Sequence, residues 1–294
     1  SLIRPQQSNH MNETSSATDN NSAISRKTAL VTGASAGIGA EFARQLAAQG
    51  HDLVVTARRL DRLQQLAAEL QQQHGIKVSC IAADLAAADA VKELVAEMTA
   101  QQLQIDILIN NAGYGVPGQL TDVTWDDHQR FMQVLVMAVI ELSHRLLPGM
   151  QQRGYGRIVN VASLAGLVPG TASHTLYSAS KAFLIRLSES LALENEQHGI
   201  RVQALCPGFT YSEFHDVTGS RELVSQMPKY MWMQAEDVVR ISLQALEHPK
   251  PPVLVVPGRV NRTLARIAAW LPHRRALNLV RQRSRKYRQQ DSDA

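Results

Sequence analysis

The sequence predicts an α/β fold with a doubly wound, parallel Rossmann-type sheet of about seven strands and helices on both faces. Short apolar runs alternate with longer helical patterns through most of the chain. The 294 residues are 45% hydrophobic but only 5% aromatic, which suits a sheet covered by helices rich in small residues. Because strands and helices alternate, right-handed βαβ crossovers should place helices on both faces of the sheet.

The strand signal is a short β-branched or apolar run, and the helix signal is apolar spacing of three and four residues. The expected strands are Thr28–Val31, Leu53–Thr56, Val78–Ala82, Ile105–Ile109, Arg157–Val161, Arg201–Leu205 and Val253–Val256. The expected helices are Glu41–Gln49, Leu60–Gln73, Ala87–Ala100, Trp125–Gln152 and Ser178–Gln197. Together they form one domain, since no linker rich enough to divide the chain precedes Pro249.

Composition divides the chain into three parts. Residues 1–25 are rich in Ser, Asn, Gln and Thr, so we expect disorder there, with native translation starting at Met11 and an artificial segment before it. Residues 26–258 form the Rossmann-type domain, and residues 259–294 form a basic extension. The extension holds ten Lys/Arg and two Asp, a net charge of +8, so the remainder carries about −4 of the overall +4 (4 − 8).

Cysteine usage and hydropathy bear on where the protein acts. Cys80 and Cys206 have apolar neighbours and are predicted to be reduced core residues, which favours a cytoplasmic setting. The sequence shows no apolar run of about 18 residues, so no transmembrane helix is expected. It shows no signal peptide either, because the first 25 residues lack an apolar core.

A glycine-rich turn follows the first strand and opens the first helix. Gly33, Gly37 and Gly39 stand in Thr-Gly-Ala-Ser-Ala-Gly-Ile-Gly, where the backbone can turn tightly and approach a pyrophosphate at the helix N-terminus. A tight turn without a ligand is the alternative, which the position between strand and helix disfavours.

The end of the second strand carries two arginines instead of an acidic residue. A carboxylate about 20 residues after the glycine turn would bind the free 2′-hydroxyl of NAD. Arg58 and Arg59 match a 2′-phosphate, which a guanidinium binds through paired, charge-assisted hydrogen bonds. NADP(H) is therefore favoured over NAD(H), with Arg58 the stronger candidate; the alternative is that one arginine of the pair is merely solvated.

Further motifs follow strands four and five. Asn110-Asn111-Ala112-Gly113 closes the fourth strand, Ser163 follows the fifth, and Tyr177-Ser178-Ala179-Ser180-Lys181 starts a helix. With the glycine turn, this ordered set resembles the short-chain dehydrogenase/reductase family in its single-domain form, over residues 26–258. The resemblance implies an NADP(H)-dependent oxidoreductase that interconverts a carbonyl and an alcohol by hydride transfer.

The resemblance also assigns cofactor contacts, each at a residue that matches a family motif. Asp84 would contact adenine, Pro207 and Gly208 would lie near the nicotinamide, and Ser212 would contact the carboxamide where relatives carry Thr. Taken singly, Asp84 could be a helix N-terminal charge and Pro-Gly an ordinary turn. The full expected set is Gly33, Ser35, Gly37, Ile38, Gly39, Arg58, Arg59, Asp84, Asn110, Asn111, Ala112, Gly113, Tyr177, Lys181, Pro207, Gly208 and Ser212.

Ser163, Tyr177 and Lys181 are the expected catalytic residues. Tyr177 and Lys181 are four residues apart and share a helix face. A nearby ammonium is expected to lower the phenol pKa and suit it to acid/base work. Tyr177 would protonate the carbonyl oxygen in reduction, and Ser163 would hydrogen-bond the same oxygen. By resemblance, Lys181 would also hold the ribose hydroxyls of the nicotinamide.

One position departs from the family pattern. Members carry a catalytic Asn midway along the long helix, and counting back from Leu147-Pro148 places Leu135 there. A leucine cannot hold a water by hydrogen bonds, so we hypothesise slower proton resupply or another route, for example through a backbone carbonyl. An unchanged kcat in Leu135→Asn would contradict this. The alternatives are that Leu135 is an ordinary core residue, or that the protein is a catalytically weakened NADP(H)-binding sensor or scaffold.

Two further predictions concern the substrate and the partners. Phe209–Met233 is rich in Met and aromatic residues, which favours a bulky hydrophobic carbonyl or alcohol, although these residues could simply pack on the core. By resemblance, the Trp125–Gln152 and Tyr177 helices form a subunit interface in a homodimer or homotetramer.

The basic extension is amphipathic. Leu264, Ile267 and Trp270 stand among arginines, and Pro272 should divide two short helices. We expect them to dock on the core or a partner subunit, or, as the second choice, to make peripheral contact with a membrane; a solvated tail is the remaining alternative. No nucleic acid is expected, since charge is the only feature that would favour it.

Overall fold

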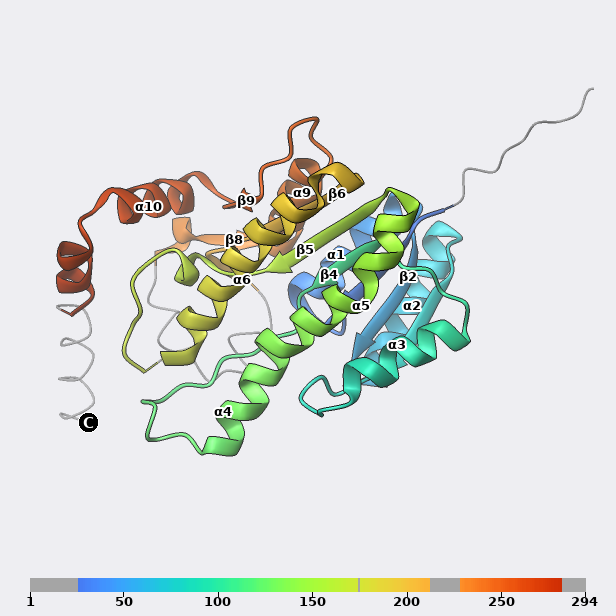
Figure 1. Ribbon diagram of the computed structural model, residues 1–294, viewed down its shortest axis with the longest axis horizontal. Helices are drawn as coiled ribbons and strands as arrows, with labels where there is room; N and C mark the ends of the chain where they lie inside the picture. The colour runs from blue at the N-terminus through green and yellow to red at the C-terminus, as the bar shows by residue number, and fades with distance from the viewer. Residues whose placement is uncertain (1–25, 174, 212–227, 282–294) are drawn as a thin grey trace, which may run out of the picture.

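The computed structural model describes residues 26–173, 175–211 and 228–281. Seven parallel strands form one sheet in the order β3-β2-β1-β4-β5-β6-β9, the central layer of Figure 1. The doubly wound parallel sheet that the sequence predicts is confirmed. Its strands are β1 (Thr28–Thr32), β2 (Asp52–Ala57), β3 (Val78–Ala82), β4 (Ile107–Asn110), β5 (Gly156–Val161), β6 (Ile200–Leu205) and β9 (Leu254–Val255).

Helices cover both faces of the sheet (Figure 1). One layer comprises α1 (Gly37–Ala48), α2 (Leu60–His74) and α9 (Ala235–Leu246); the other comprises α3 (Ala90–Ala100), α5 (Ala138–Arg153) and α6 (Thr175–Asn195). Alternating strand residues feed the two cores: Val31 packs on the first layer and its neighbour Leu30 on the second. Burying each such side chain contributes about 2 kcal/mol.

The strand order reverses between β1 and β4. The chain runs outward from β1 to β3, then returns to β4 and continues outward through β6. In sheets of this kind, ligands bind at the carboxyl ends of the strands beside that reversal. The motifs that follow β1, β4, β5 and β6 therefore meet at one edge of the sheet.

One long helix carries a local change of winding. It consists of α4 (Trp125–Met132), the π-helical turn η1 (Gln133–Met137) and α5, where the sequence predicts a single regular helix. By length and composition alone it could cross a membrane, but half of its apolar stretch is buried inside the protein. We assign it to the core, since Leu135, Leu142 and Met150 pack against the sheet.

The sequence analysis missed several elements near the C-terminal end. It assigned no element to α9, although Val238, Val239, Leu243 and Leu246 bury one helical face. It also missed the small parallel pair β7 (Phe209–Tyr211) and β8 (Trp232–Gln234). Helix α10 (Arg259–Trp270) is followed by a helical segment over residues 273–281, separated at Pro272 as predicted.

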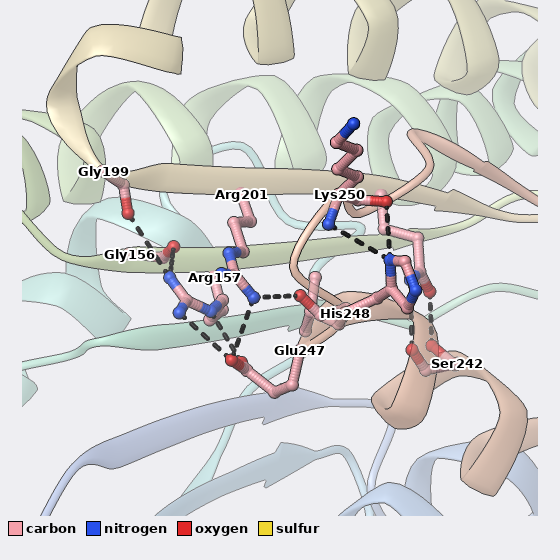
Figure 2. A network of polar contacts seen from close by, with 10 residues as sticks. Gly156, Arg157, Gly199, Arg201, Ser242, Glu247, His248 and Lys250 are labelled. Atoms are coloured by element: carbon pink, nitrogen blue, oxygen red, sulfur yellow. Dashed lines mark hydrogen bonds and ion pairs between the residues drawn. The ribbon is translucent and has the colours of Figure 1, made fainter.

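An ionic network ties strands β5 and β6 to the end of α9 at the amino ends of the strands (Figure 2). The Arg157 side chain is 8% exposed and donates two hydrogen bonds to the Glu247 carboxylate, at 2.7 and 3.2 Å. Arg201 donates to the same carboxylate at 3.1 Å. Burial by itself would raise the pKa of Glu247, but the hydrogen bonds and charge of Arg157, with the charge of Arg201, make the net shift a lowering.

Glu247→Ala is expected to destabilise the fold by roughly 1–2 kcal/mol, because the buried Arg157 loses its carboxylate; the half-exposed Glu247 keeps the loss below that of a fully buried pair. The control is Glu189→Ala, which breaks an exposed pair with Arg186 and should cost less than about 0.5 kcal/mol. Urea unfolding measures both. Because the pKa of Glu247 is lowered in the fold, its contribution is complete above pH of about 4.3 and is lost as pH falls further. Equal losses in the two variants would contradict the prediction.

Candidate active site

The glycine turn presents a bare helix N-terminus at the carboxyl end of β1. Gly33 and Gly37 adopt positive φ angles of 65° and 55°, which glycine tolerates best. Helix α1 begins at Gly37 after the extended Ala36, which makes no capping hydrogen bond through its side chain, and its first turn has no acidic residue. Its unpaired N–H groups and positive dipole are therefore available to an anion.

The turn is packed so closely that larger residues would not fit. A Cβ on Gly39 would lie 2.3 Å from the Gly33 carbonyl oxygen and 2.4 Å from Asn111 Nδ2. Asn111 Nδ2 donates to the carbonyl oxygens of Thr32 and Gly33 at 3.0 and 3.2 Å. The Thr32 hydroxyl accepts from the N–H groups of Asn111 and Ala112, both at 3.0 Å. Asn111 thus ties the β4 motif to the β1 turn, and sequence reasoning missed the part of Thr32.

The two arginines after β2 differ in placement. Arg59 Nη2 donates to the Ser35 hydroxyl at 3.1 Å, so this guanidinium lies against the glycine turn. Arg58 is exposed. The structure therefore places Arg59, the weaker of the two predicted candidates, against the glycine turn.

Two further predicted residues occupy defined positions. Asp84 accepts a hydrogen bond from the Ala86 N–H at 3.2 Å and forms an ion pair with Arg130 at 3.1 Å. Asn110 Nδ2 donates to Asn160 Oδ1 at 2.8 Å, and Asn160 Nδ2 donates to the Ser188 hydroxyl at 2.9 Å. This buried chain joins β4, β5 and α6, so Asn110 supports the site from within the sheet.

Ser163, Tyr177 and Lys181 come together beyond the carboxyl end of β5. Ser163 caps the short helix η2 (Leu164–Gly166), and its hydroxyl accepts from the Ala165 N–H at 3.1 Å. The Tyr177 phenol is hydrogen-bonded to the Ser163 side chain. Lys181 lies one helical turn further along α6, with Nζ 5.6 Å from the Tyr177 ring centroid. The predicted grouping of the three residues is present.

A close contact holds this arrangement in place. A Cβ on Gly166 would lie 2.7 Å from the Lys181 carbonyl carbon and 2.8 Å from the Ala182 nitrogen. The backbone of η2 therefore packs directly on α6, which fixes Ser163 relative to Tyr177. The Lys181 ammonium donates to the Val161 carbonyl oxygen at 2.8 Å.

Burial dominates the acid–base properties of these groups. It raises the pKa of Tyr177, and the hydrogen bond from Ser163 offsets this only in part. The prediction that Lys181 makes the pKa of Tyr177 lower than that of a free phenol is therefore wrong. Burial lowers the pKa of Lys181 to about 8, with the nearby Cys206 thiol acting in the opposite sense. Burial raises the pKa of Cys206 to about 12, against the Ser163 backbone and the Lys181 charge.

The cysteines match their predicted state. Both Cys80 and Cys206 are free thiols, the first half-buried and the second fully buried. The position of Cys206 near Lys181 was not predicted, because no local sequence pattern relates the two residues.

Leu135 lies in the π-helical turn η1 and is fully buried. A Cβ added to Gly113 would lie 3.6 Å from Leu135 Cγ, so Leu135 packs against the motif that follows β4. The side chain has no polar atom, and the Lys181 ammonium donates instead to the Val161 carbonyl oxygen. This geometry agrees with a core role for Leu135, and the hypothesis about proton resupply stays a prediction.

The Pro207-Gly208 turn after β6 is braced from the C-terminal extension. Asn261 of α10 is 2% exposed, and its side-chain atoms lie 2.6–2.7 Å from the place where a Gly208 Cβ would stand. Asn261 Nδ2 donates to the Pro257 carbonyl oxygen at 3.0 Å. Sequence reasoning did not foresee this contact. Ser212 lies outside the described residues.

A small hollow of about 10 Å³ lies beside Tyr177. Its lining is mixed: Val116, Leu120, Phe131 and Leu176 are apolar, and His128 and Thr175 are polar. These lining residues were not predicted, because they come from three separate segments: the connection between β4 and α4, helix α4 and the start of α6. In the segment Phe209–Met233, which is predicted to contact the substrate and is called the lid below, the Tyr211 ring stacks on Trp232 at 4.8 Å and Phe209 lies 5.5 Å from Trp232. Phe214 and Met227 of the same segment fall outside the described residues.

Comparison with known proteins supplies the class. The family model described as short chain dehydrogenase matches residues 27–222. An uncharacterized oxidoreductase of Myxococcus xanthus is 33% identical over 246 residues, which cover 82% of this chain and 94% of that protein.

Solved structures agree with that match. A short-chain dehydrogenase from Sphingobium yanoikuyae in complex with NADPH is 33% identical, with a TM-score of 0.74 over 83% of this chain and 93% of that chain. A bulky-bulky ketone specific alcohol dehydrogenase from Comamonas testosteroni is 29% identical, with a TM-score of 0.69 over 84% and 95%. A short chain dehydrogenase/reductase from Burkholderia phymatum in complex with NAD is 25% identical, with a TM-score of 0.73 over 82% and 92%.

The fold, the site and these matches define an oxidoreductase. The chain belongs to the short-chain dehydrogenase family. As a member it acts on CH–OH or carbonyl groups with a nicotinamide dinucleotide, and structures of its relatives hold NADPH or NAD.

Proposed function

We propose that the protein is an NADP(H)-dependent reductase or dehydrogenase that interconverts a bulky hydrophobic carbonyl and its alcohol. The observation that carries the proposal is the grouping of Ser163, Tyr177 and Lys181 at the same sheet edge as the bare N-terminus of α1. The Tyr177 proton donor, the Ser163 hydroxyl and the anion-binding N-terminus of α1 would then surround one ligand site, the crevice at this edge of the sheet.

The residues around the crevice fit a phosphorylated dinucleotide. The N–H groups at the start of α1 would bind its pyrophosphate, and Arg59 beside Ser35 would bind a 2′-phosphate, assisted by Arg58. Lys181 would hold the ribose hydroxyls beside the nicotinamide. When bound, the nicotinamide supplies or accepts the hydride.

The chain's own part in the reaction is proton transfer. Because burial keeps the Tyr177 phenol protonated at neutral pH, it can give its proton to a carbonyl oxygen during reduction. Ser163 hydrogen-bonds the same oxygen and stabilises developing negative charge. The Lys181 ammonium is held by the Val161 carbonyl oxygen one helical turn from Tyr177, and it is the group from which the phenol would regain its proton.

Apolar side chains near Tyr177 support the proposed substrate class. Val116, Leu120, Phe131 and Leu176 contribute to the hollow beside Tyr177, together with the polar His128 and Thr175, and the lid carries the stacked Tyr211 and Trp232. Such surfaces bind apolar groups on both sides of a reacting carbon. The similarity to an alcohol dehydrogenase described as specific for bulky-bulky ketones supports the same class.

Cofactor preference is tested by changing the arginines. We expect wild-type kcat/KM for NADPH to exceed that for NADH with a hydrophobic ketone, and Arg59→Asp to lower the NADPH value by about 100-fold, because two charge-assisted hydrogen bonds are lost and a repulsive charge is added. Arg58→Asp should have a smaller effect, since Arg59 is the arginine that contacts the turn. The control Arg186→Asp removes an exposed arginine of α6 and should change neither value. A wild-type preference for NADH would overturn the NADP(H) assignment.

Leu135 supports a second candidate function. A sensor or scaffold that binds NADP(H) without turnover would share the crevice but would not need the Tyr177 proton. Replacing Tyr177 with phenylalanine separates the two functions, because only an enzyme has turnover to lose.

A homodimer or homotetramer stays a prediction. Exposed apolar side chains on the two helices expected at the interface support it: Met137 in η1, and Phe183 and Leu193 on α6.

A further inference from the structure

Helix α10, drawn in dark red in Figure 1, projects from the domain beyond β9 and the small β7–β8 sheet. Its attachment is polar and local: the buried Asn261 bonds the Pro257 carbonyl, and the helix contacts the short helix η4 (Lys229–Met231). Most of its remaining side chains face solvent. Within the described residues, α10 thus packs on its own domain mainly around Asn261, and its docking on a partner subunit stays a prediction.

The exposed surface of α10 includes an apolar stripe. Val260, Leu264 and Ile267 follow one another at spacings of four and three residues and so lie on one side of the helix. Ile267 is 55% exposed, and Trp270 at the end of the helix is 89% exposed. Leu277 and Leu279 are exposed in the next helical segment. Single exposed apolar residues are ordinary, but a contiguous set marks an interaction site.

Arginines flank that stripe. Residues 259–281 contain six arginines and no acidic residue. Arg259, Arg262 and Arg266 are all exposed on α10. The surface therefore combines an apolar stripe, positive charge and an exposed tryptophan, the composition of helices that lie in a membrane interface. Arginine stems can lie along the apolar region while their charged heads reach the lipid phosphates.

We propose that α10, with the segment over residues 273–281, docks on an anionic membrane surface. Charge complementarity selects this occupant over a second copy of the chain, since a two-fold contact through α10 would oppose arginines to arginines. Anionic lipid headgroups supply the matching charge, and the acyl boundary accepts Ile267 and Trp270.

The docked helix lies close to the substrate side of the domain. Asn261 braces Gly208, and α10 contacts η4, which precedes β8. Docking would therefore bring the aromatic lid near the lipid surface, where an apolar carbonyl compound partitions. This last step rests on the proposed function; the docking itself does not.

The test is sedimentation of the full chain with vesicles of phosphatidylcholine alone or with phosphatidylglycerol added. We expect binding to the anionic vesicles only, weakened by salt. The triple variant Arg259→Gln/Arg262→Gln/Arg266→Gln should lower the partition coefficient by roughly 100-fold, given about fivefold for each arginine near the surface. The tryptophan emission of the bound protein should shift to shorter wavelength, and Trp270→Phe should remove the shift.

The matched control is Arg44→Gln/Arg186→Gln/Arg240→Gln, which takes net charge from +4 to +1 (4 − 3), as the first triple variant does, but changes exposed ion pairs elsewhere. It should keep most of the binding. Equal loss in both variants, or no binding by the wild type, overturns the proposal. A concentration-dependent dimer that Ile267→Ser abolishes would assign the surface to a second copy instead. Dinucleotide binding, measured in the same samples, keeps the two proposals distinguishable and shows that each variant is folded.

Discussion

Tyr177→Phe is expected to lower kcat for reduction of a hydrophobic ketone by about 10³-fold, because the proton donor at the carbonyl oxygen is lost. The ring remains, so packing in α6 should be unchanged. NADPH affinity should fall by no more than about fivefold, the value of one hydrogen bond. Steady-state NADPH oxidation and fluorescence titration of NADPH measure the two quantities.

A second tyrosine gives a matched control. Tyr155 precedes β5 at the opposite end of the sheet, where Lys27 and Arg157 lie 4.5 and 4.2 Å from its ring centroid. Tyr155→Phe removes the same atom and should leave kcat within about twofold, because a residue remote from the site contributes little. If Tyr177→Phe also leaves turnover unchanged, or if the wild type binds NADPH without turnover on any hydrophobic ketone or aldehyde tried, a sensor function replaces the enzyme function.

Local sequence patterns carried most of the fold. Each strand of the sheet is a short apolar run, and the motifs at Gly33, Asn111, Ser163 and Pro207 each follow one of those strands directly. Parallel topology then brings the ends of β1, β4, β5 and β6 to one edge. That is why Gly33, Asn111 and Ser163 could be assigned to a common site before their distances were known.

Contacts between distant segments were beyond such reasoning. Asn261 beneath Gly208, Arg130 against Asp84 and the Val161 carbonyl at Lys181 join residues that no periodicity relates. The pKa of Tyr177 was misjudged for the same reason: proximity of Lys181 along the helix was visible, but desolvation depends on all elements packed around the phenol. The π-helical turn at Leu135 also leaves no signal in a pattern of apolar spacing.

Lys181→Met is expected to abolish reduction and yet stabilise the protein without bound dinucleotide at neutral pH. The ammonium is buried, with the Val161 carbonyl oxygen as its acceptor, and its pKa is lowered to about 8. A lowering from about 10.4 in the unfolded chain corresponds to a cost on the order of 3 kcal/mol while the group is charged. Methionine removes that cost but leaves the Val161 carbonyl without its donor, a loss of about 1–2 kcal/mol. A net gain of roughly 1–2 kcal/mol follows at pH 7.

The pH dependence of unfolding separately tests whether the buried ammonium destabilises the fold. Below pH 8 the lysine is protonated in both states, so the cost is complete. Between pH 8 and about 10.4 the unfolded chain binds more protons than the fold, so the wild type gains stability as pH rises. The advantage of Lys181→Met should therefore shrink from pH 7 to pH 9, as urea unfolding at each pH would show. The raised pKa of Cys206 acts in the opposite direction only above about pH 8.5, where the unfolded thiol ionises. A variant that is less stable than the wild type at both pH values would mean that the buried ammonium is fully compensated, and that the site places no strain on the fold.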